Sequence, residues 1–171
     1  LKGKYVEVGE MQNISSEEGQ SRLDQVKETL SDVEGIDQTK FVNKYALDTG
    51  NENPRLFDTF ESYQEYKDKY GGSWVGGQTG QEQIGKKWIG AAKVGDVSTV
   101  YRNAVATDIK SYRFDAAGGF FDINASAGIE SGIFVTGHEL GHHGQVGNTL
   151  SGEIYANKAG ANYLNHYRNR E

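Results

Sequence analysis

The sequence contains no cysteine, which excludes disulfide bonds and zinc sites built from thiolates. Acidic residues outnumber basic ones and give a formal net charge of −6 at pH 7, so the charge offers no support for nucleic-acid binding. Apolar runs of membrane-spanning length are missing, and residues 1–20 have no apolar segment of the kind found in signal peptides. We therefore expect neither a nucleic-acid partner nor a membrane span.

Proline occurs once among the 171 residues, whereas glycine occurs 23 times and tyrosine 10 times. A chain of this length suits one domain, and its composition predicts a small core with many polar-tipped rings. We expect residues 1–95 to form a helical and glycine-rich N-terminal part of the same domain, followed by its core over residues 96–171. The chain begins with Leu1 rather than methionine, which favours a fragment of a larger protein.

Residues 138–142 are His-Glu-Leu-Gly-His and carry the most informative pattern in the sequence. On a helix, His138 and His142 lie four residues apart on one face, where both imidazoles can reach one zinc ion. Glu139 then lies beside the metal, where it can take a proton from a water molecule. The competing interpretation is a helix that carries two histidines by chance, but the apolar run at residues 133–135 predicts a packed helix at this place.

The third zinc ligand is the main question that the motif leaves open. A catalytic zinc site takes three protein ligands and keeps one position for water. Glu153, near the start of a second predicted helix, is the preferred ligand, and His166 is the alternative. His143 points away from the face that carries the motif histidines, and Glu171 ends the chain.

Ser151 is the expected N-cap of that second helix, which has an apolar stripe at helical spacing. The stripe consists of Ala156, Ala159, Gly160, Tyr163, Leu164 and Tyr167. Its small residues predict close packing on the motif helix, with Glu153 turned toward the metal. Asn157, one turn after Glu153, is placed to orient a ligand. Three side chains are candidate donors to the oxyanion of the transition state: Tyr155, Tyr163 and His166.

The His-Glu-x-x-His motif followed by a glutamate on the next helix resembles the gluzincin group of zincin metallopeptidases. Residues 153–161, Glu-Ile-Tyr-Ala-Asn-Lys-Ala-Gly-Ala, are similar to the E-x-x-A-N-x-x-A stretch of the short ImmA/IrrE-type peptidases. The two motifs also resemble metallopeptidase domains at the C-terminal ends of bacterial polymorphic toxins. The resemblance covers roughly the last 45 residues. The metzincin pattern is not met, since Gln145 and Asn148 stand in place of its glycine and third histidine.

The resemblance implies an α+β fold of zincin type, with a small twisted sheet, an active-site helix, and a second C-terminal helix that carries the third zinc ligand, after an N-terminal helical part. It implies a zinc-dependent metalloendopeptidase that hydrolyses a protein or peptide substrate, with Zn²⁺ held by His138, His142 and Glu153. Glu139 is the expected base.

The resemblance to toxin domains further implies that the chain is the C-terminal toxin or effector domain of a larger bacterial protein, secreted or delivered into a target cell. An immunity protein or the parent toxin is then a further partner. Two alternatives remain at this point. One is a regulatory or housekeeping zinc peptidase, and the other is a binding module whose motif is decayed or coincidental.

The hydrophobic periodicity predicts helices early in the chain and strands in its middle. Helices are expected at residues 15–34, with Ser15 and Glu18 as a capping box, at 40–48 and at 56–70. A flexible glycine-rich loop is expected at 71–95. Strands are expected at 97–105, 109–114 and 120–123, with a turn at 115–119. In a zincin fold an edge strand binds the substrate backbone, and residues 119–125 are the candidate.

Overall fold

In the computed structural model the described residues are 4–33, 36, 39–51, 53–80, 83–84, 87–88, 97–114, 119–141 and 150–169. Helices and strands are mixed along this chain. The helices are α1 (Ser16–Thr29), α2 (Phe60–Tyr70), α3 (Arg102–Ala106), α4 (Ile129–Gly141) and α5 (Leu150–Arg168). The strands are β1 (Lys4–Met11), β2 (Thr39–Val42), β3 (Tyr45–Asp48), β4 (Arg55–Phe57), β5 (Ser73–Trp74), β6 (Gly77–Gly80), β7 (Gln83–Ile84), β8 (Lys87–Trp88), β9 (Val97–Tyr101), β10 (Thr107–Phe114) and β11 (Gly119–Ala125). The fold is therefore of the α+β class, as the sequence predicted.

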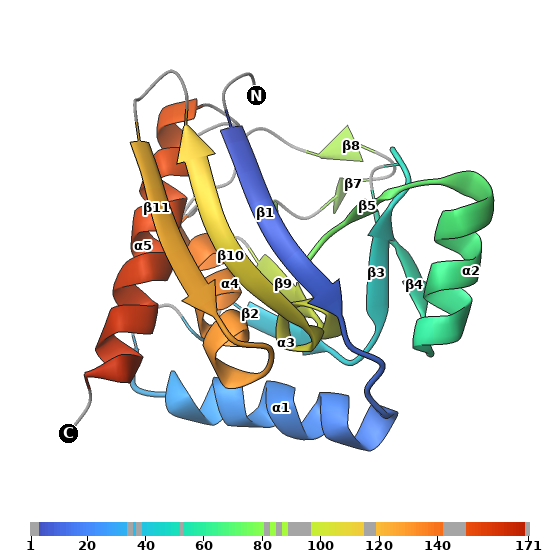
Figure 1. Cartoon of the computed structure of the whole chain (residues 1–171), viewed down its shortest axis with the longest axis horizontal. Coiled ribbons are helices and arrows are strands. Elements are labelled where there is room, and N and C mark those ends of the chain that lie inside the picture. Colours follow the sequence, from blue (N-terminus) through green and yellow to red (C-terminus); the bar gives the residue numbers. More distant parts are fainter. Residues whose placement is uncertain are drawn as a thin grey trace.

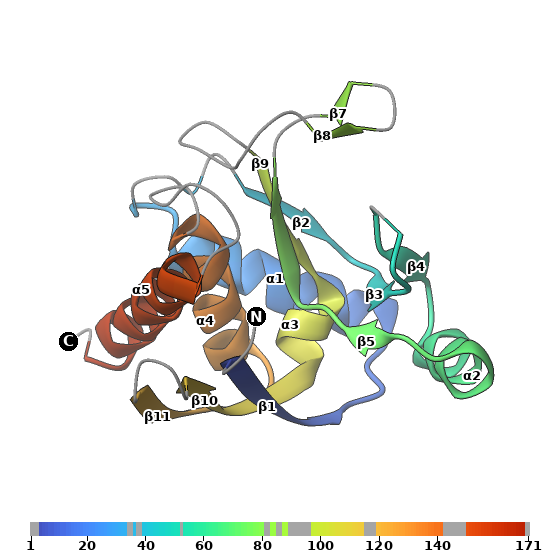
Figure 2. The same ribbon diagram turned by 90° about the horizontal axis from the view of Figure 1, so that it is seen from above.

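Helix α4 lies in the middle of the molecule, between two three-stranded sheets (Figures 1 and 2). One sheet has the order β1-β10-β11 and is antiparallel throughout. The other has the order β2-β9-β6, in which β2 is parallel and β6 antiparallel to the central β9. Helix α5 packs along α4, and α2 with the sheet β4-β3-β5 forms a lobe at one side. Residues 131–141 of α4 are consequently buried without exception.

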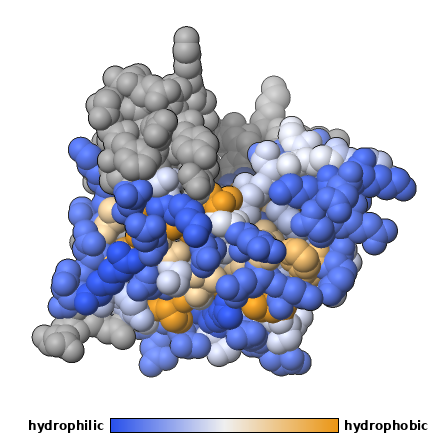
Figure 3. Space-filling view, in the orientation of Figure 1, coloured by the Kyte–Doolittle hydropathy of each residue, from blue (hydrophilic) through white to orange (hydrophobic). Residues whose placement is uncertain are grey.

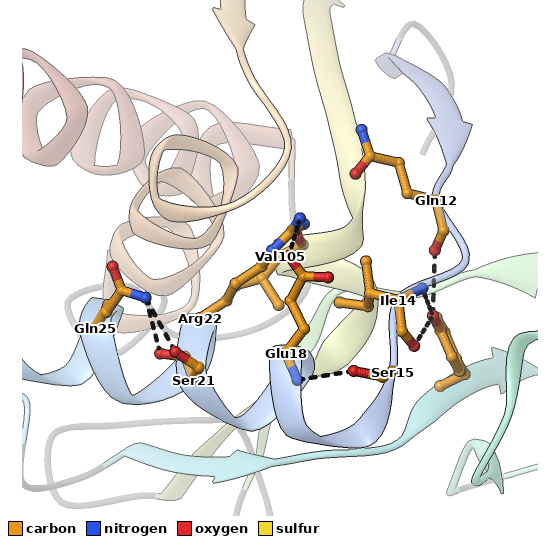
Figure 4. Close-up of polar contacts among 9 residues, drawn as sticks. Gln12, Ile14, Ser15, Glu18, Ser21, Arg22, Gln25 and Val105 are labelled. Atoms are coloured by element: carbon orange, nitrogen blue, oxygen red, sulfur yellow. Dashed lines mark hydrogen bonds and ion pairs between the residues drawn. The ribbon is translucent and has the colours of Figure 1, made fainter.

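Helix α1 begins where the sequence predicted, and polar contacts fix its first turns (Figure 4). Ser15 is the N-cap, and its hydroxyl accepts a hydrogen bond from the backbone N–H of Glu18 at 3.1 Å. The Glu18 carboxylate, the other side chain of the expected capping box, accepts a hydrogen bond from Arg22 at 3.1 Å. Arg22 also donates to the backbone oxygen of Val105 at 2.7 Å, which ties α1 to α3. The helix ends at Thr29, earlier than predicted.

The helix predicted at residues 40–48 is wrong, since these residues belong to β2 and β3. Tyr45, Ala46 and Leu47 are all buried, which is the pattern of a strand covered on both faces. The next predicted helix, at 56–70, is confirmed from Phe60 onward, where α2 begins after its N-cap Thr59.

The strand predicted at residues 97–105 ends at Tyr101, and α3 follows it. Helix α3 is completely buried, and its polar side chains bond to distant backbone groups. The Asn103 amide accepts from the backbone N–H of Ala46 at 3.0 Å and donates to its oxygen at 2.6 Å. Arg102 donates to the side-chain oxygen of Asn43 at 2.8 Å and to its backbone oxygen at 2.9 Å. These long-range bonds favour a helical turn that the local alternation of side chains does not predict.

The glycine-rich segment at residues 71–95, predicted as a flexible loop, contains strands in its described part. The most important of these is β6, which pairs with β9 along its whole length. The strands predicted at 109–114 and 120–123 are confirmed as β10 and β11. The predicted turn between these strands falls mostly on residues 115–118, which lie outside the described residues.

Helices α4 and α5 approach closely because glycines stand at their contact. A Cβ atom at Gly141 would lie 2.9 Å from both the Cα of Ala156 and the Cβ of Ala159. A Cβ at Gly160 would lie 2.7 Å from the backbone oxygen of Phe134. The predicted packing of small residues against the motif helix is therefore confirmed. It fixes the register of the two helices that carry the candidate site.

The surface seen in Figure 3 is mostly hydrophilic, and hydrophobic residues show there as separate patches. Among the described residues, the large hydrophobic side chains that are well exposed are Leu56 (46%) and Tyr70 (64%). Leu56 belongs to β4 rather than to the helix predicted at residues 56–70, and Tyr70 is the last residue of α2. Within the described ranges, no helix has the length and apolar character needed to cross a membrane.

Candidate active site

Helix α4 places His138 and Glu139 near its C-terminal end, in the centre of the fold. Each of the two residues is only 8% exposed. Nε2 of His138 lies 3.9 Å from Oε2 of Glu139, so the imidazole and the carboxylate are neighbours. His142, the second histidine of the motif, lies outside the described residues. The described half of the motif is therefore a buried polar pair at the end of a central helix.

The imidazole of His138 is oriented by Asn157 of α5. Nδ1 of His138 lies 2.6 Å from Oδ1 of Asn157, and the asparagine is fully buried. Because an amide oxygen only accepts hydrogen bonds, Nδ1 donates in this contact, and in the neutral imidazole Nε2 then carries the lone pair. The nitrogen able to bind a metal is thus the one beside Glu139. The Nδ2 of Asn157 has no hydrogen-bond partner within the described part of the chain, although buried amide donors are normally paired.

The carboxylate of Glu139 is held by the sheet β2-β9-β6. The hydroxyl of Thr79 in β6 lies 2.6 Å from Oε1 of Glu139 and 2.9 Å from its backbone oxygen. The hydroxyl of Ser98 in β9 lies 3.1 Å from that of Thr79. Gly77 allows this close approach, since a Cβ there would lie 2.8 Å from Cγ of Glu139. One carboxylate oxygen therefore faces β6 and the other faces His138.

Tyr101, at the end of β9, lies near this carboxylate. Its hydroxyl donates to Oε1 of Gln78 in β6 at 3.3 Å, and the residue is 6% exposed. Burial raises the pKa of the Tyr101 phenol to about 12, and the negative charge of Glu139 adds to the shift. The phenol consequently stays protonated at neutral pH.

The structure does not bring all predicted site residues together. Glu153 and Tyr155 belong to the first turns of α5, but their side chains lie outside the described part. His166 is exposed on α5, nine residues after Asn157, which is about 14 Å along the helix axis. Tyr163 packs against Gly137, where a Cβ would lie 2.8 Å from the Tyr163 ring.

A complete metal-binding set is not present among the described side chains, which include no cluster of three or more histidine, aspartate or glutamate residues. The side chains of two predicted ligands, His142 and Glu153, lie outside the described part of the chain. Of the predicted ligands, the structure therefore places His138 alone, with Glu139 and Asn157 around it.

Thr79 and Ser98 were not predicted from the sequence. Their hydroxyls contact each other, and the hydroxyl of Thr79 also contacts Glu139. Thr79 lies 60 positions before Glu139, in a four-residue strand with glycine at both ends, which has no recognisable local pattern. β11, the predicted substrate strand, is an edge strand of its sheet, but the edge strand that contacts Glu139 is β6. Because β6 precedes residue 96, both predicted parts of the chain contribute to one site.

Comparisons of the chain with protein-family models, with curated proteins and with solved structures find no significant match.

Proposed function

We propose that the protein is a zinc-dependent metallopeptidase of the gluzincin type, with a zincin-like arrangement of α4, α5 and the sheet β2-β9-β6. The observation that carries the proposal is the 2.6 Å contact between Nδ1 of His138 and Oδ1 of Asn157. A histidine that binds a metal usually donates its other ring N–H to a carboxylate or carbonyl oxygen. Asn157 provides that oxygen and directs Nε2 toward the side on which Glu139 lies.

The proposed zinc ligands are His138, His142 and Glu153. His142 follows His138 by four residues and so belongs on the same face of a continued helix. Glu153 precedes Asn157 by four residues, on the face of α5 that contacts His138. Two imidazoles and a carboxylate form a donor set that zinc hydrolases use. The unpaired Nδ2 of Asn157 also fits this set, because a carboxylate or water oxygen at the site would accept its hydrogen bond.

Zinc bound there would polarise the scissile carbonyl and lower the pKa of a coordinated water molecule. Glu139 is the general base in this proposal: its carboxylate takes a proton from the attacking water and passes it to the leaving amine. The edge of β6 supplies backbone groups that can pair with an extended peptide beside Glu139. Residues around the pair exclude most bulk water, since His138 and Glu139 are each 8% exposed.

Metal analysis of the purified full chain tests the ligand assignment. We expect about one zinc per chain in the wild type and loss of most zinc in His138→Ala, His142→Ala and Glu153→Ala. His143→Ala is the matched control for His142→Ala, because it removes the neighbouring histidine and should keep the metal. Full zinc occupancy in Glu153→Ala would contradict the assignment of the third ligand.

Hydrolysis of a set of internally quenched fluorogenic peptides tests the chemistry. Glu139→Gln has nearly the same shape as the wild type but cannot accept the proton, so it should keep zinc and lose nearly all activity. Wild-type protein that carries zinc but cleaves no better than Glu139→Gln would refute the peptidase mechanism.

We further propose a toxin or effector setting, which rests on the resemblance of the two motifs to toxin domains. Wild type and Glu139→Gln should be expressed in the cytosol of bacterial and eukaryotic hosts. Growth inhibition by the wild type alone would support this setting. Normal growth of both hosts, with peptide cleavage by the purified protein, would favour a non-toxic peptidase.

A further inference from the structure

We propose that Thr79 is a positioning residue that fixes the carboxylate of Glu139 for proton transfer, an inference that rests on the proposed peptidase function. A general base must hold one oxygen toward the attacking water throughout the reaction. In this protein the two carboxylate oxygens have different neighbours. Oε1 is bonded to the Thr79 hydroxyl at 2.6 Å, and Oε2 lies 3.9 Å from Nε2 of His138.

The protons of this cluster favour one arrangement of donors. The Thr79 hydroxyl has a single proton and three oxygens within reach, two of Glu139 and one of Ser98. The shortest contact is to the carboxylate, which is also the strongest acceptor because it is charged. Thr79 therefore donates to Oε1, and Ser98 can donate to Thr79 at 3.1 Å. The resulting chain of hydroxyls strengthens the bond to Glu139.

Packing restricts the stem of the same side chain. Gly77 and Thr79 are two residues apart in β6, so both face α4. A Cβ at Gly77 would lie 2.8 Å from Cγ of Glu139 and 3.2 Å from Cγ1 of Val135. The backbone of β6 thus lies directly on the Glu139 side chain. The stem is confined by Gly77 and the carboxylate by Thr79, which leaves Oε2 on the side of His138.

The role of Thr79 predicts a specific kinetic result. Thr79→Val keeps the shape and the strand propensity but removes the hydroxyl. We expect kcat for a cleaved fluorogenic peptide to fall about 10–100-fold, the range observed when partners that orient the ligands of a metal site are removed. KM should stay within about twofold, because the backbone edge of β6 is unchanged and only the transition state loses stabilisation. Thr79→Ser keeps the hydroxyl and should stay within about threefold of the wild-type kcat.

Two further variants separate positioning from general stability. Thr107→Val removes another buried threonine hydroxyl. That hydroxyl accepts a hydrogen bond from Nε1 of Trp74 at 3.1 Å and is not bonded to Glu139. This variant should lower the melting temperature while keeping kcat. Thr79→Ala replaces Thr79→Val should the latter not fold. Zinc content and circular dichroism are measured for every variant.

These measurements distinguish a failure of the positioning role of Thr79 from a failure of the proposed peptidase function. An inactive wild type, equal to Glu139→Gln, refutes the peptidase function and with it the role of Thr79. An active wild type with an equally active, folded Thr79→Val refutes the positioning role alone. A serine variant as impaired as the valine variant also refutes it, since the hydroxyl would then not be the group that matters. A low kcat in Thr79→Val with unchanged zinc, unchanged KM and rescue by serine supports it.

Discussion

Replacing Asn157 with leucine removes the acceptor for the His138 N–H while keeping a side chain of similar size. The contact is 2.6 Å long, and Asn157 is fully buried with His138 8% exposed, so water cannot readily replace the lost oxygen. A buried donor left without a partner costs about 1–3 kcal/mol. Loss of such an orienting partner usually lowers metal affinity about 10–100-fold. We therefore expect Asn157→Leu to fold with reduced stability and to bind zinc about 10–100-fold more weakly than the wild type.

Asn157→Asp is the informative companion, because it keeps an acceptor at the same place. Carboxylate–histidine–zinc arrangements are common, so this variant should bind zinc at least as tightly as the wild type. Affinity is measured by competition with a chromophoric chelator near neutral pH. Asn162→Leu, at an exposed position of the same helix, should leave zinc affinity unchanged. A folded Asn157→Leu with wild-type affinity, or an aspartate variant weaker than the leucine variant, would show that Asn157 does not orient a metal ligand.

Three further predictions concern stability. Gly141→Ala should destabilise the fold by about 1–2 kcal/mol, seen as a melting temperature about 2–8 °C lower, because its Cβ would meet the backbone of Ala156 at 2.9 Å; an unchanged melting temperature would contradict the close packing. The hydrogen bond and charge of Arg168 lower the pKa of Glu130 from 4.5, so the stability from this pair is present above pH 4.5 and is lost as the pH falls through the lowered pKa. Urea unfolding of Glu130→Gln should therefore show a deficit of about 0.5–1 kcal/mol at neutral pH that disappears in acid, and an equal deficit at both pH values would refute this. Zinc at about 100 times its dissociation constant should stabilise the wild type by about 2.7 kcal/mol but not His138→Ala, as measured by thermal unfolding.

Helix α1 was predictable because it carries an apolar stripe at helical spacing and a signal for its first turn. Leu23 and Val26 of α1 are buried as their spacing predicts, and Ser15 caps the helix. The failures have a different cause. Residues 45–47 are buried in succession, a pattern that periodicity cannot assign to helix or strand. Helix α3 exists because its polar side chains bond to segments far away in the sequence, which local patterns do not contain.

The residues of the candidate site also fall into those that local sequence patterns predict and those that they do not. His138 and Glu139 were found from a spacing that only a helix makes meaningful, and Asn157 from its place one turn after Glu153. Their partners on the sheet could not be predicted in this way. Thr79 reaches Glu139 only because β6 pairs with β9, a contact between distant parts of the sequence. The sequence therefore predicts the polar pair of the candidate site, whereas the hydroxyls that contact the Glu139 carboxylate appear only when the sheet is assembled.

The burial of α4 gives a separate reason to assign a function to its polar pair. Residues 131–141 are all buried, so this helix has no solvent face on which polar residues would be expected. Thr136 donates to the backbone oxygen of Gly132 one turn earlier, which is how hydroxyls are usually satisfied in a helix interior, and Ser131 donates to the backbone oxygen of Ala104 in α3. His138 and Glu139 differ, because each is held by a side chain from another element, one on α5 and one on β6. Burying an ionisable pair is unfavourable unless such partners are provided. Two elements thus supply polar side chains to a buried pair that apolar residues would replace with a gain in stability, and this supports the proposed chemical role of His138 and Glu139.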